Sequence, residues 1–163
     1  MIASIEFTNF KILRSARIEL APFNLIIGPN GSGKTSVLVA LQRLRQFAGR
    51  PPQFVTKATP ESKDCGQLLF RFHAPFADLT AQLECAPDGA GRALRIIGGH
   101  DATARWPVLM ARLAAVRVVA LEQSALARPS PAGAPILLGD DGTNLPAALD
   151  RLQREEPETF ARI

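Results

Sequence analysis

The stretch that decides the fold is Gly28-Pro29-Asn30-Gly31-Ser32-Gly33-Lys34-Thr35. It matches the phosphate-loop pattern G-x-x-x-x-G-K-[ST] in full. In this pattern the glycines leave room for backbone N–H groups to surround phosphate oxygens, because no side chain crowds the loop. The lysine carries a point charge to the β- and γ-phosphates, and the threonine hydroxyl can bind Mg²⁺. The stretch therefore predicts a nucleotide phosphate site, with Ser36 as the next helical residue.

The residues on either side of this loop predict a strand before it and a helix after it. The run Phe23–Ile27 is mainly apolar and does not alternate, which is typical of a strand buried on both faces of a parallel sheet. After the loop, apolar residues recur at helical spacing: Val37, Leu41, Leu44 and Ala48. Gly49 and the prolines that follow it indicate the end of this helix.

Alternation of apolar and polar residues predicts two groups of antiparallel strands. Ile2–Phe7 and Arg17–Leu20 indicate a hairpin with a break at residues 11–15. A polar, proline-bearing loop is expected from Arg50 to Gly66. Alternation then returns in three runs: Leu68–Phe72, Leu79–Cys85 and Leu94–Ile96. We therefore expect an antiparallel β insertion over residues 67–98.

The remaining residues, 106–163, are expected to form helices and one strand. Trp106–Ala115 is predicted to be a short helix opened by Pro107, and Val116–Leu121 a buried strand. Gly139–Gly142 indicates a turn, after which Asn144 can cap a helix. That helix carries three leucines at helical spacing: Leu145, Leu149 and Leu152. Pro157 opens a further helix.

Composition indicates a packed domain and excludes several classes of protein. The chain has 163 residues, 47% of them hydrophobic and 21% charged, which excludes a disordered chain. No apolar run is long enough to span a membrane, and the N-terminus lacks a secretory signal. Cys65 and Cys85 are too few for a disulfide framework, so we expect a cytosolic protein with reduced thiols. The net charge of +4 suits an anionic partner or a solvated basic surface.

Two further segments carry a resemblance to a known family. The opening I-x-x-x-F-x-N-F-K, about 20 residues before the loop, is matched by five residues: Ile5, Phe7, Asn9, Phe10 and Lys11. With the phosphate loop, it resembles the ATPase heads of the SMC, RecF and OLD group, which are ABC-type ATPases often described as AAA-type. The run Asp141–Leu145 is similar to a D-G-x-N-L segment in ATPases of this group.

The resemblance implies an α/β fold with a mostly parallel P-loop NTPase core and an antiparallel β subdomain. Residues 1–163 would be a single N-terminal lobe of such a head: residues 1–49 hold the hairpin, loop strand and helix, 67–98 the β insertion, and 106–163 helices and a strand. It implies ATP and Mg²⁺ as cofactors, with Thr35 on Mg²⁺. The nucleotide would be bound by Gly28, Pro29, Asn30, Gly31, Ser32, Gly33, Lys34, Thr35, Ser36 and Lys11.

The same resemblance implies partners and a cellular role. In this family two heads sandwich ATP, so a second head forming a homodimer and a downstream C-terminal lobe are expected. DNA is a further expected partner, and the role would lie in DNA repair, DNA maintenance or phage defence in the cytoplasm. Arg43, Arg45 and Arg50 on the helix after the loop could contact DNA or simply form a solvated face.

Motifs that the family needs for hydrolysis are missing from the sequence. Val118–Glu122 has the apolar run of a Walker B strand without the aspartate, and Ile136–Asp141 has carboxylates after a run that Gly139 breaks. No L-S-x-G-like signature is present. The catalytic residues therefore remain unassigned, and the chain looks like an incomplete head. Gln123 is a candidate for the glutamine that senses Mg²⁺ and nucleotide, with Gln67 as its rival.

Two other functions fit the same loop. One is a nucleotide-binding interaction module that never hydrolyses ATP, which agrees with the missing Walker B motif. The other is a small P-loop kinase, against which stand the N-F-K opening and the scattered positions of Arg92, Arg95 and Arg105. His73 and His100 are isolated, so metal binding by protein side chains alone is not expected.

Overall fold

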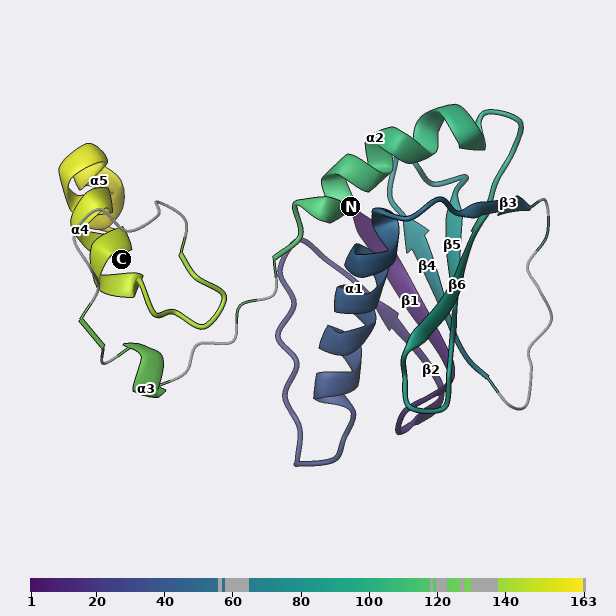
Figure 1. Ribbon diagram of the computed structural model, residues 1–163, viewed down its shortest axis with the longest axis horizontal. Coiled ribbons are helices and arrows are strands. Elements are labelled where there is room, and N and C mark those ends of the chain that lie inside the picture. Colours follow the sequence, from purple (N-terminus) through teal and green to yellow (C-terminus); the bar gives the residue numbers. More distant parts are fainter. Residues whose placement is uncertain are drawn as a thin grey trace. The chain divides into compact units, whose positions relative to one another are not determined.

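The computed structural model describes residues 1–55, 57, 65–117, 119, 123–126, 128–129 and 138–162. The chain divides into two compact units, Met1–Val116 and Arg117–Ile163. Among the described residues, the first unit has a six-stranded sheet with two long helices, and the second has three short helices (Figure 1). None of the described helices is long and apolar enough to cross a membrane.

The sheet of the first unit is mostly antiparallel. Its strands are β1 (Ile2–Phe10), β2 (Leu13–Glu19), β3 (Gln53–Val55), β4 (Gly66–Phe72), β5 (Thr80–Cys85) and β6 (Gly91–Ile97). Their order is β2-β1-β4-β5-β6-β3, and only β3 and β6 run parallel. The expected hairpin and the expected antiparallel strands are confirmed, and they join into one sheet. The expectation of a mostly parallel core is wrong for the described residues.

One face of this sheet forms the core together with α1 (Lys34–Ala48) and α2 (Ala102–Ala114). Alternate residues point to it, such as Ile5 and Phe7 on β1 and Leu68 and Phe70 on β4, and all four are at most 1% exposed. This alternation explains the antiparallel pairing, because antiparallel sheets commonly bury one face and leave the other polar.

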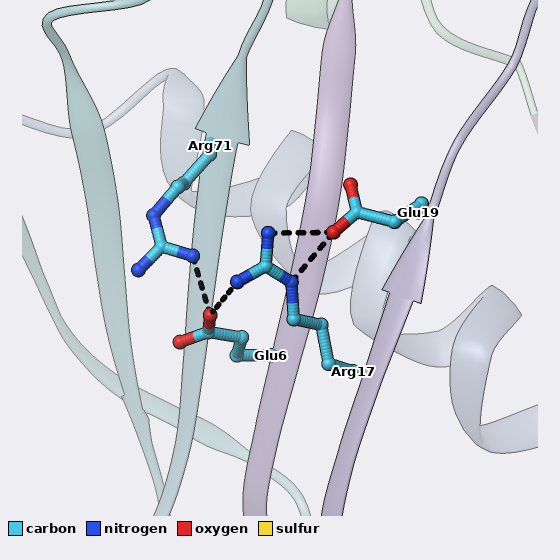
Figure 2. A network of polar contacts seen from close by, with 4 residues as sticks. All are labelled: Glu6, Arg17, Glu19 and Arg71. Atoms are coloured by element: carbon cyan, nitrogen blue, oxygen red, sulfur yellow. Dashed lines mark hydrogen bonds and ion pairs between the residues drawn. The ribbon is translucent and has the colours of Figure 1, made fainter.

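The opposite face of the sheet carries charged side chains on three neighbouring strands. Figure 2 shows Glu6 on β1 between Arg17 on β2 and Arg71 on β4, with the helices behind the sheet. Arg17 also pairs with Glu19, with 2.6 Å between Arg17 Nε and Glu19 Oε1. Arg17 lies directly opposite Glu6, whereas Arg71 lies opposite Ser4 and is therefore diagonal to Glu6. Long side chains can reach both kinds of neighbour, so these ion pairs link β2, β1 and β4 on the polar face.

The buried strand expected before the loop is not formed. Residues 24–29 have no regular secondary structure, and Phe23, Leu25 and Ile27 are 82%, 73% and 81% exposed. The sheet of the described residues gives this segment no neighbouring strand. The apolar composition of this segment favours burial on both faces. A strand forms, however, only where neighbouring strands supply hydrogen bonds.

Two other expectations need smaller corrections. The loop expected from Arg50 to Gly66 contains β3, whose three residues pair with β6. The helix expected to begin near Pro107 begins at Ala102, so Pro107 lies inside α2. Proline removes one backbone donor; here the acceptor that loses its partner is the carbonyl of Thr103, an exposed residue. Helix α1 ends at Ala48 before Gly49, as expected.

The second unit contains α3 (Gln123–Leu126), α4 (Leu145–Glu155) and α5 (Pro157–Phe160). The turn at Gly139–Gly142 and the helix opened by Pro157 are confirmed. Asn144 occupies the N-cap position of α4, but its side chain accepts a hydrogen bond from the N–H of Gly139 rather than capping the helix. The strand expected at Val116–Leu121 and the run Ile136–Leu138 lie largely outside the described residues.

Candidate nucleotide-binding site

The glycines of the loop adopt backbone angles that other residues rarely take. Gly31 has φ +80° and Gly33 has φ +97°. At Gly33 a Cβ would also lie 2.7 Å from Leu13 Cδ2, so both conformation and space require glycine there. A Cβ at Gly28 would lie 2.8 Å from Ser32 Oγ. The loop therefore curves tightly, as a backbone that surrounds an anion must.

Helix α1 begins directly at the end of this loop. Gly33 is its N-cap residue and offers no side chain to cap it, and the first turn contains no acidic residue. The first N–H groups of a helix have no partner within the helix, and here they belong to Lys34, Thr35 and Ser36. The helix dipole adds positive potential at the same place. The start of α1 is therefore suited to a negatively charged group.

Lys34 folds back over the loop. Its Nζ donates hydrogen bonds to the carbonyl oxygens of Gly28 and Pro29, at 2.8 and 2.7 Å. The ammonium group is therefore held above the loop, and these two bonds would have to rearrange for it to reach a phosphate. Neither of these two acceptors could be inferred from the residue pattern of the loop.

Thr35 and Ser36 differ in access. Thr35 is exposed, whereas Ser36 is only 6% exposed. Because an accessible hydroxyl at the start of the helix can bind Mg²⁺ next to the phosphates, the position of Thr35 fits a Mg-nucleotide. Among the described residues, no group of three or more His, Cys, Asp or Glu side chains could hold a metal ion by itself.

The tip of the β1–β2 hairpin lies beside the loop. Leu13 and Ile12 approach Gly33, with 3.5 Å between Ile12 Cγ2 and the position of a Gly33 Cβ. Lys11, at φ +54°, belongs to the same tip, and its side chain lies against Gly89. Sequence reasoning included Lys11 but missed Leu13, whose role as a wall of the loop is visible only in three dimensions.

The two candidate glutamines lie in different units. Gln67 is on β4, 8% exposed, and faces away from the side that α1 covers, because its neighbour Leu68 points into the core. The structure therefore does not bring Gln67 to the loop. Gln123 begins α3 in the second unit and is exposed, and its role as a Mg²⁺ sensor remains a prediction.

The carboxylates considered for hydrolysis belong to a turn. Asp140 pairs with Arg117, with 2.7 Å between Arg117 Nη2 and Asp140 Oδ1. Asp141 accepts hydrogen bonds from the backbone and hydroxyl of Thr143, which lower the pKa of the Asp141 carboxyl. Gly142 has φ +84° and completes the turn. Both carboxylates are thus engaged in local contacts of the second unit, while Glu122 lies outside the described residues.

Comparison with known proteins bears on the first part of the chain. Residues 1–71 match the AAA ATPase domain family. A similar protein is the DNA replication and repair protein RecF of Aliivibrio fischeri (strain MJ11), which is 37% identical over 79 residues. The resemblance to the RecF and SMC group is confirmed. The match with RecF covers 45% of this chain and 21% of the relative, so the chain matches about a fifth of the RecF length.

The matched part of this RecF/SMC-like chain contains the elements of the candidate site. Residues 1–71 include β1, β2, the phosphate loop and α1. The family match ends before the second unit, and the similarity of Asp141–Leu145 to a D-G-x-N-L segment therefore remains a prediction.

Proposed function

We propose that the chain binds Mg-ATP through residues 28–36 as part of a RecF/SMC-like ATPase in the cytoplasm. The observation that carries the proposal is the loop geometry: glycines at φ +80° and +97° lead directly into the uncapped start of α1. The match of residues 1–71 to the AAA ATPase domain family supports it. The same geometry alone would suit other nucleotides, and the family match favours ATP.

Each group at the site has a distinct role in this proposal. Backbone N–H groups of the loop and the first turn of α1 would surround the β-phosphate. Lys34 would exchange its two carbonyl acceptors for phosphate oxygens, and Thr35 would place its hydroxyl on Mg²⁺. Lys11, at the neighbouring hairpin tip, would add positive charge beside the nucleotide.

Binding without hydrolysis is the second candidate function. The contacts of Asp140 with Arg117 and of Asp141 with Thr143 favour it, because a water-activating carboxylate must be available to reach the γ-phosphate. Interactions that hold ground and transition states equally do not raise the rate of a reaction. We therefore propose that this chain alone binds ATP and turns it over negligibly.

Three partners are part of the proposal. The exposed run Phe23–Ile27 supports a downstream C-terminal lobe that would supply neighbouring strands. A second head would complete the site across a homodimer interface. DNA is proposed because the RecF relative is described as a DNA replication and repair protein, and repair or maintenance of DNA is the role we favour over phage defence.

The experiment is calorimetric titration of Mg-ATP into the wild-type chain and the Lys34→Ala variant. We expect saturable binding to the wild type and loss of binding in the variant, by at least about tenfold and with little loss of fold, because a charge-assisted contact contributes about 1.5–3 kcal/mol. Lys57→Ala removes the same charge from an exposed position and should bind as the wild type does. Equal affinity of the Lys34→Ala variant would contradict the proposal. Single-turnover hydrolysis in the same samples separates binding from catalysis.

A further inference from the structure

A second pocket lies at the far end of α1. It has a volume of about 310 Å³ and opens between the C-terminal end of α1 and the first residues of β6. Phe47 and Leu94 form its buried wall, and Arg50 and Arg92 stand at its exposed rim. The described residues that line it include two guanidinium groups and no carboxylate.

Arg50 presents a flat surface to this pocket. Its Cζ lies 4.6 Å from the centroid of the Phe47 ring, and its backbone N–H donates to the Phe47 carbonyl at 2.9 Å. The guanidinium group of Arg50 therefore lies over the Phe47 ring at a cation–π distance. Because the Arg50 residue is exposed, the guanidinium is also accessible to a second flat group, and arginine stacks well on aromatic systems.

Arg92 supplies a positive charge whose printed side-chain contact among the described residues is with an uncharged group. Its Nη1 donates to the sulfur of Cys65 at 3.2 Å, and a thiol is a weak, uncharged acceptor. The neighbouring carboxylate of Glu84 is already paired with Arg95 at 2.9 Å. A guanidinium has five N–H donors, so Arg92 can pair with a ligand oxyanion while it keeps its contact with Cys65.

Gly91 allows the Phe47 ring to pack closely against the backbone at this pocket. A Cβ at Gly91 would lie 2.2 Å from Phe47 Cε2, so the ring packs against bare backbone. This close approach sets the position of the ring on which Arg50 stacks. The pocket is therefore shaped by packing and does not depend on the two exposed side chains alone.

This pocket is separate from the phosphate loop. Helix α1 has 15 residues, which corresponds to about 22 Å at 1.5 Å per residue. The loop lies at one end of the helix and the pocket at the other. A ligand in the pocket would therefore be a second molecule.

We propose that this pocket binds a small ligand in which a flat ring carries an oxyanion. The ring stacks on Arg50 and the oxyanion pairs with Arg92. The volume falls at the small end of the range for ligand sites, so a single ring system fits it better than a longer ligand. A nucleoside monophosphate and an aromatic carboxylate share this chemistry. The proposal does not depend on nucleotide binding at the loop.

The test uses the full chain with Lys34→Ala, so that binding at the phosphate loop is suppressed. Adenosine monophosphate and indole-3-acetate are titrated while the Nε–Hε signals of the arginines are followed by NMR. We expect at least one probe to shift the Arg50 and Arg92 signals saturably. Adenosine and inorganic phosphate, which each carry one half of the chemistry, should bind at least about tenfold more weakly. The probe that binds more tightly indicates whether the pocket prefers a nucleotide or an aromatic carboxylate.

Variants then assign the contacts. Arg50→Ala and Arg92→Ala should each weaken binding about tenfold, and Arg50→Lys should do so as well, because it keeps the charge and loses the plane. Arg45→Ala removes an exposed arginine of α1 outside the pocket and serves as the control. Thermal unfolding verifies that each variant is folded. Absence of saturable shifts with both probes, or an equal loss in Arg45→Ala, would overturn the proposal.

Discussion

At the scale of single residues, Gly31 and Gly33 show two different reasons why the phosphate loop contains glycine: backbone conformation and lack of space for a side chain. Both have positive φ, but a Cβ at Gly31 meets nothing within 4 Å, whereas a Cβ at Gly33 would lie 2.7 Å from Leu13 Cδ2. We expect Gly31→Ala to lower the free energy of unfolding by about 1–2 kcal/mol, the cost of a left-handed conformation. Gly33→Ala should lower it by about 1–3 kcal/mol more, because the methyl group also crowds Leu13.

Urea unfolding of the two variants measures this difference. A third protein, Gly33→Ala with Leu13→Ala, removes the side chain that crowds the new methyl group. Leu13→Ala alone completes the cycle. If the contact with Leu13 matters, the double variant loses less stability than the sum of the losses in Gly33→Ala and Leu13→Ala. Additive losses would show that the backbone angle of Gly33 accounts for its whole effect.

Cys85 makes stability depend on pH in the alkaline range. Burial raises the pKa of its thiol from 9.0 to about 11. The unfolded chain therefore loses this proton first, and the stability contributed by the buried thiol is complete below pH 9 and lost as pH rises through 11. The shift corresponds to about 2–3 kcal/mol. We expect the free energy of unfolding to fall by this amount between pH 8.5 and 11.5, measured with urea.

Comparison with Cys85→Ala isolates this effect from the titration of lysines. The alanine variant is less stable at pH 8.5, because a buried side chain is shortened, but its stability should fall less steeply above pH 9. Cys65→Ala is the matched control, since Cys65 is partly exposed. A slope in Cys85→Ala equal to that of the wild type would rule out the buried thiol as its cause.

At the scale of elements, the ion pairs on the polar face join three strands. Glu6 on β1 binds Arg17 on β2 and Arg71 on β4, and its side chain is 27% exposed (Figure 2). We expect Glu6→Gln to lower the free energy of unfolding by about 1 kcal/mol at low salt, because it weakens two pairs at once. The loss should shrink in high salt, which screens exposed charges.

Glu19→Gln is the comparison for this prediction. Glu19 binds Arg17 alone, its side chain is 67% exposed, and its loss should stay below about 0.5 kcal/mol. Urea unfolding at about 50 mM and 500 mM salt measures both variants. An equal, salt-independent loss in the two would mean that the bridge between strands contributes nothing.

Elements whose signal lies within a short stretch of sequence could be predicted. The period of Val37, Leu41 and Leu44 predicted α1, and alternation within each run predicted the strands that flank the core. The order of strands could not be predicted in this way, because β1 pairs with β4 through contacts far apart in the sequence. The short strand β3 was missed, since three residues carry no detectable period.

In the candidate site too, features that depend on a short stretch of sequence could be predicted, and contacts between distant residues could not. The pattern of residues 28–35 located the loop and its glycines, because a phosphate loop needs particular residues at fixed spacing. Leu13 as the neighbour of Gly33, and the carbonyls that Lys34 binds, depend on how the chain folds back. The run Phe23–Ile27 is the clearest error: its composition favours a buried strand, but the sheet of the described residues gives it no neighbouring strand.

At the scale of the whole molecule, we expect the run Phe23–Ile27 to determine whether chains associate. Leu25 and Ile27 are 73% and 81% exposed in a segment that pairs with no strand of the described sheet. Unpaired extended backbone with exposed apolar side chains pairs readily with other chains. We therefore expect the chain to self-associate with rising concentration, and Leu25→Lys with Ile27→Lys to reduce this association. Because both side chains are exposed already, the double variant should unfold at nearly the wild-type temperature.

Sedimentation velocity over a hundredfold range of concentration measures the association, and thermal unfolding measures the fold. Val108→Lys is the control, because Val108 is an apolar residue of α2 that is 54% exposed and lies outside the run. It should leave association unchanged, since the effect is assigned to unpaired strand backbone and not to exposed apolar area in general. Two results would contradict this prediction. Either Val108→Lys reduces association as much as the double variant does, or the wild type stays monomeric at every concentration. A polypeptide that supplies the missing strands should suppress association in the same way and also raise the melting temperature, which the lysine variants should not do.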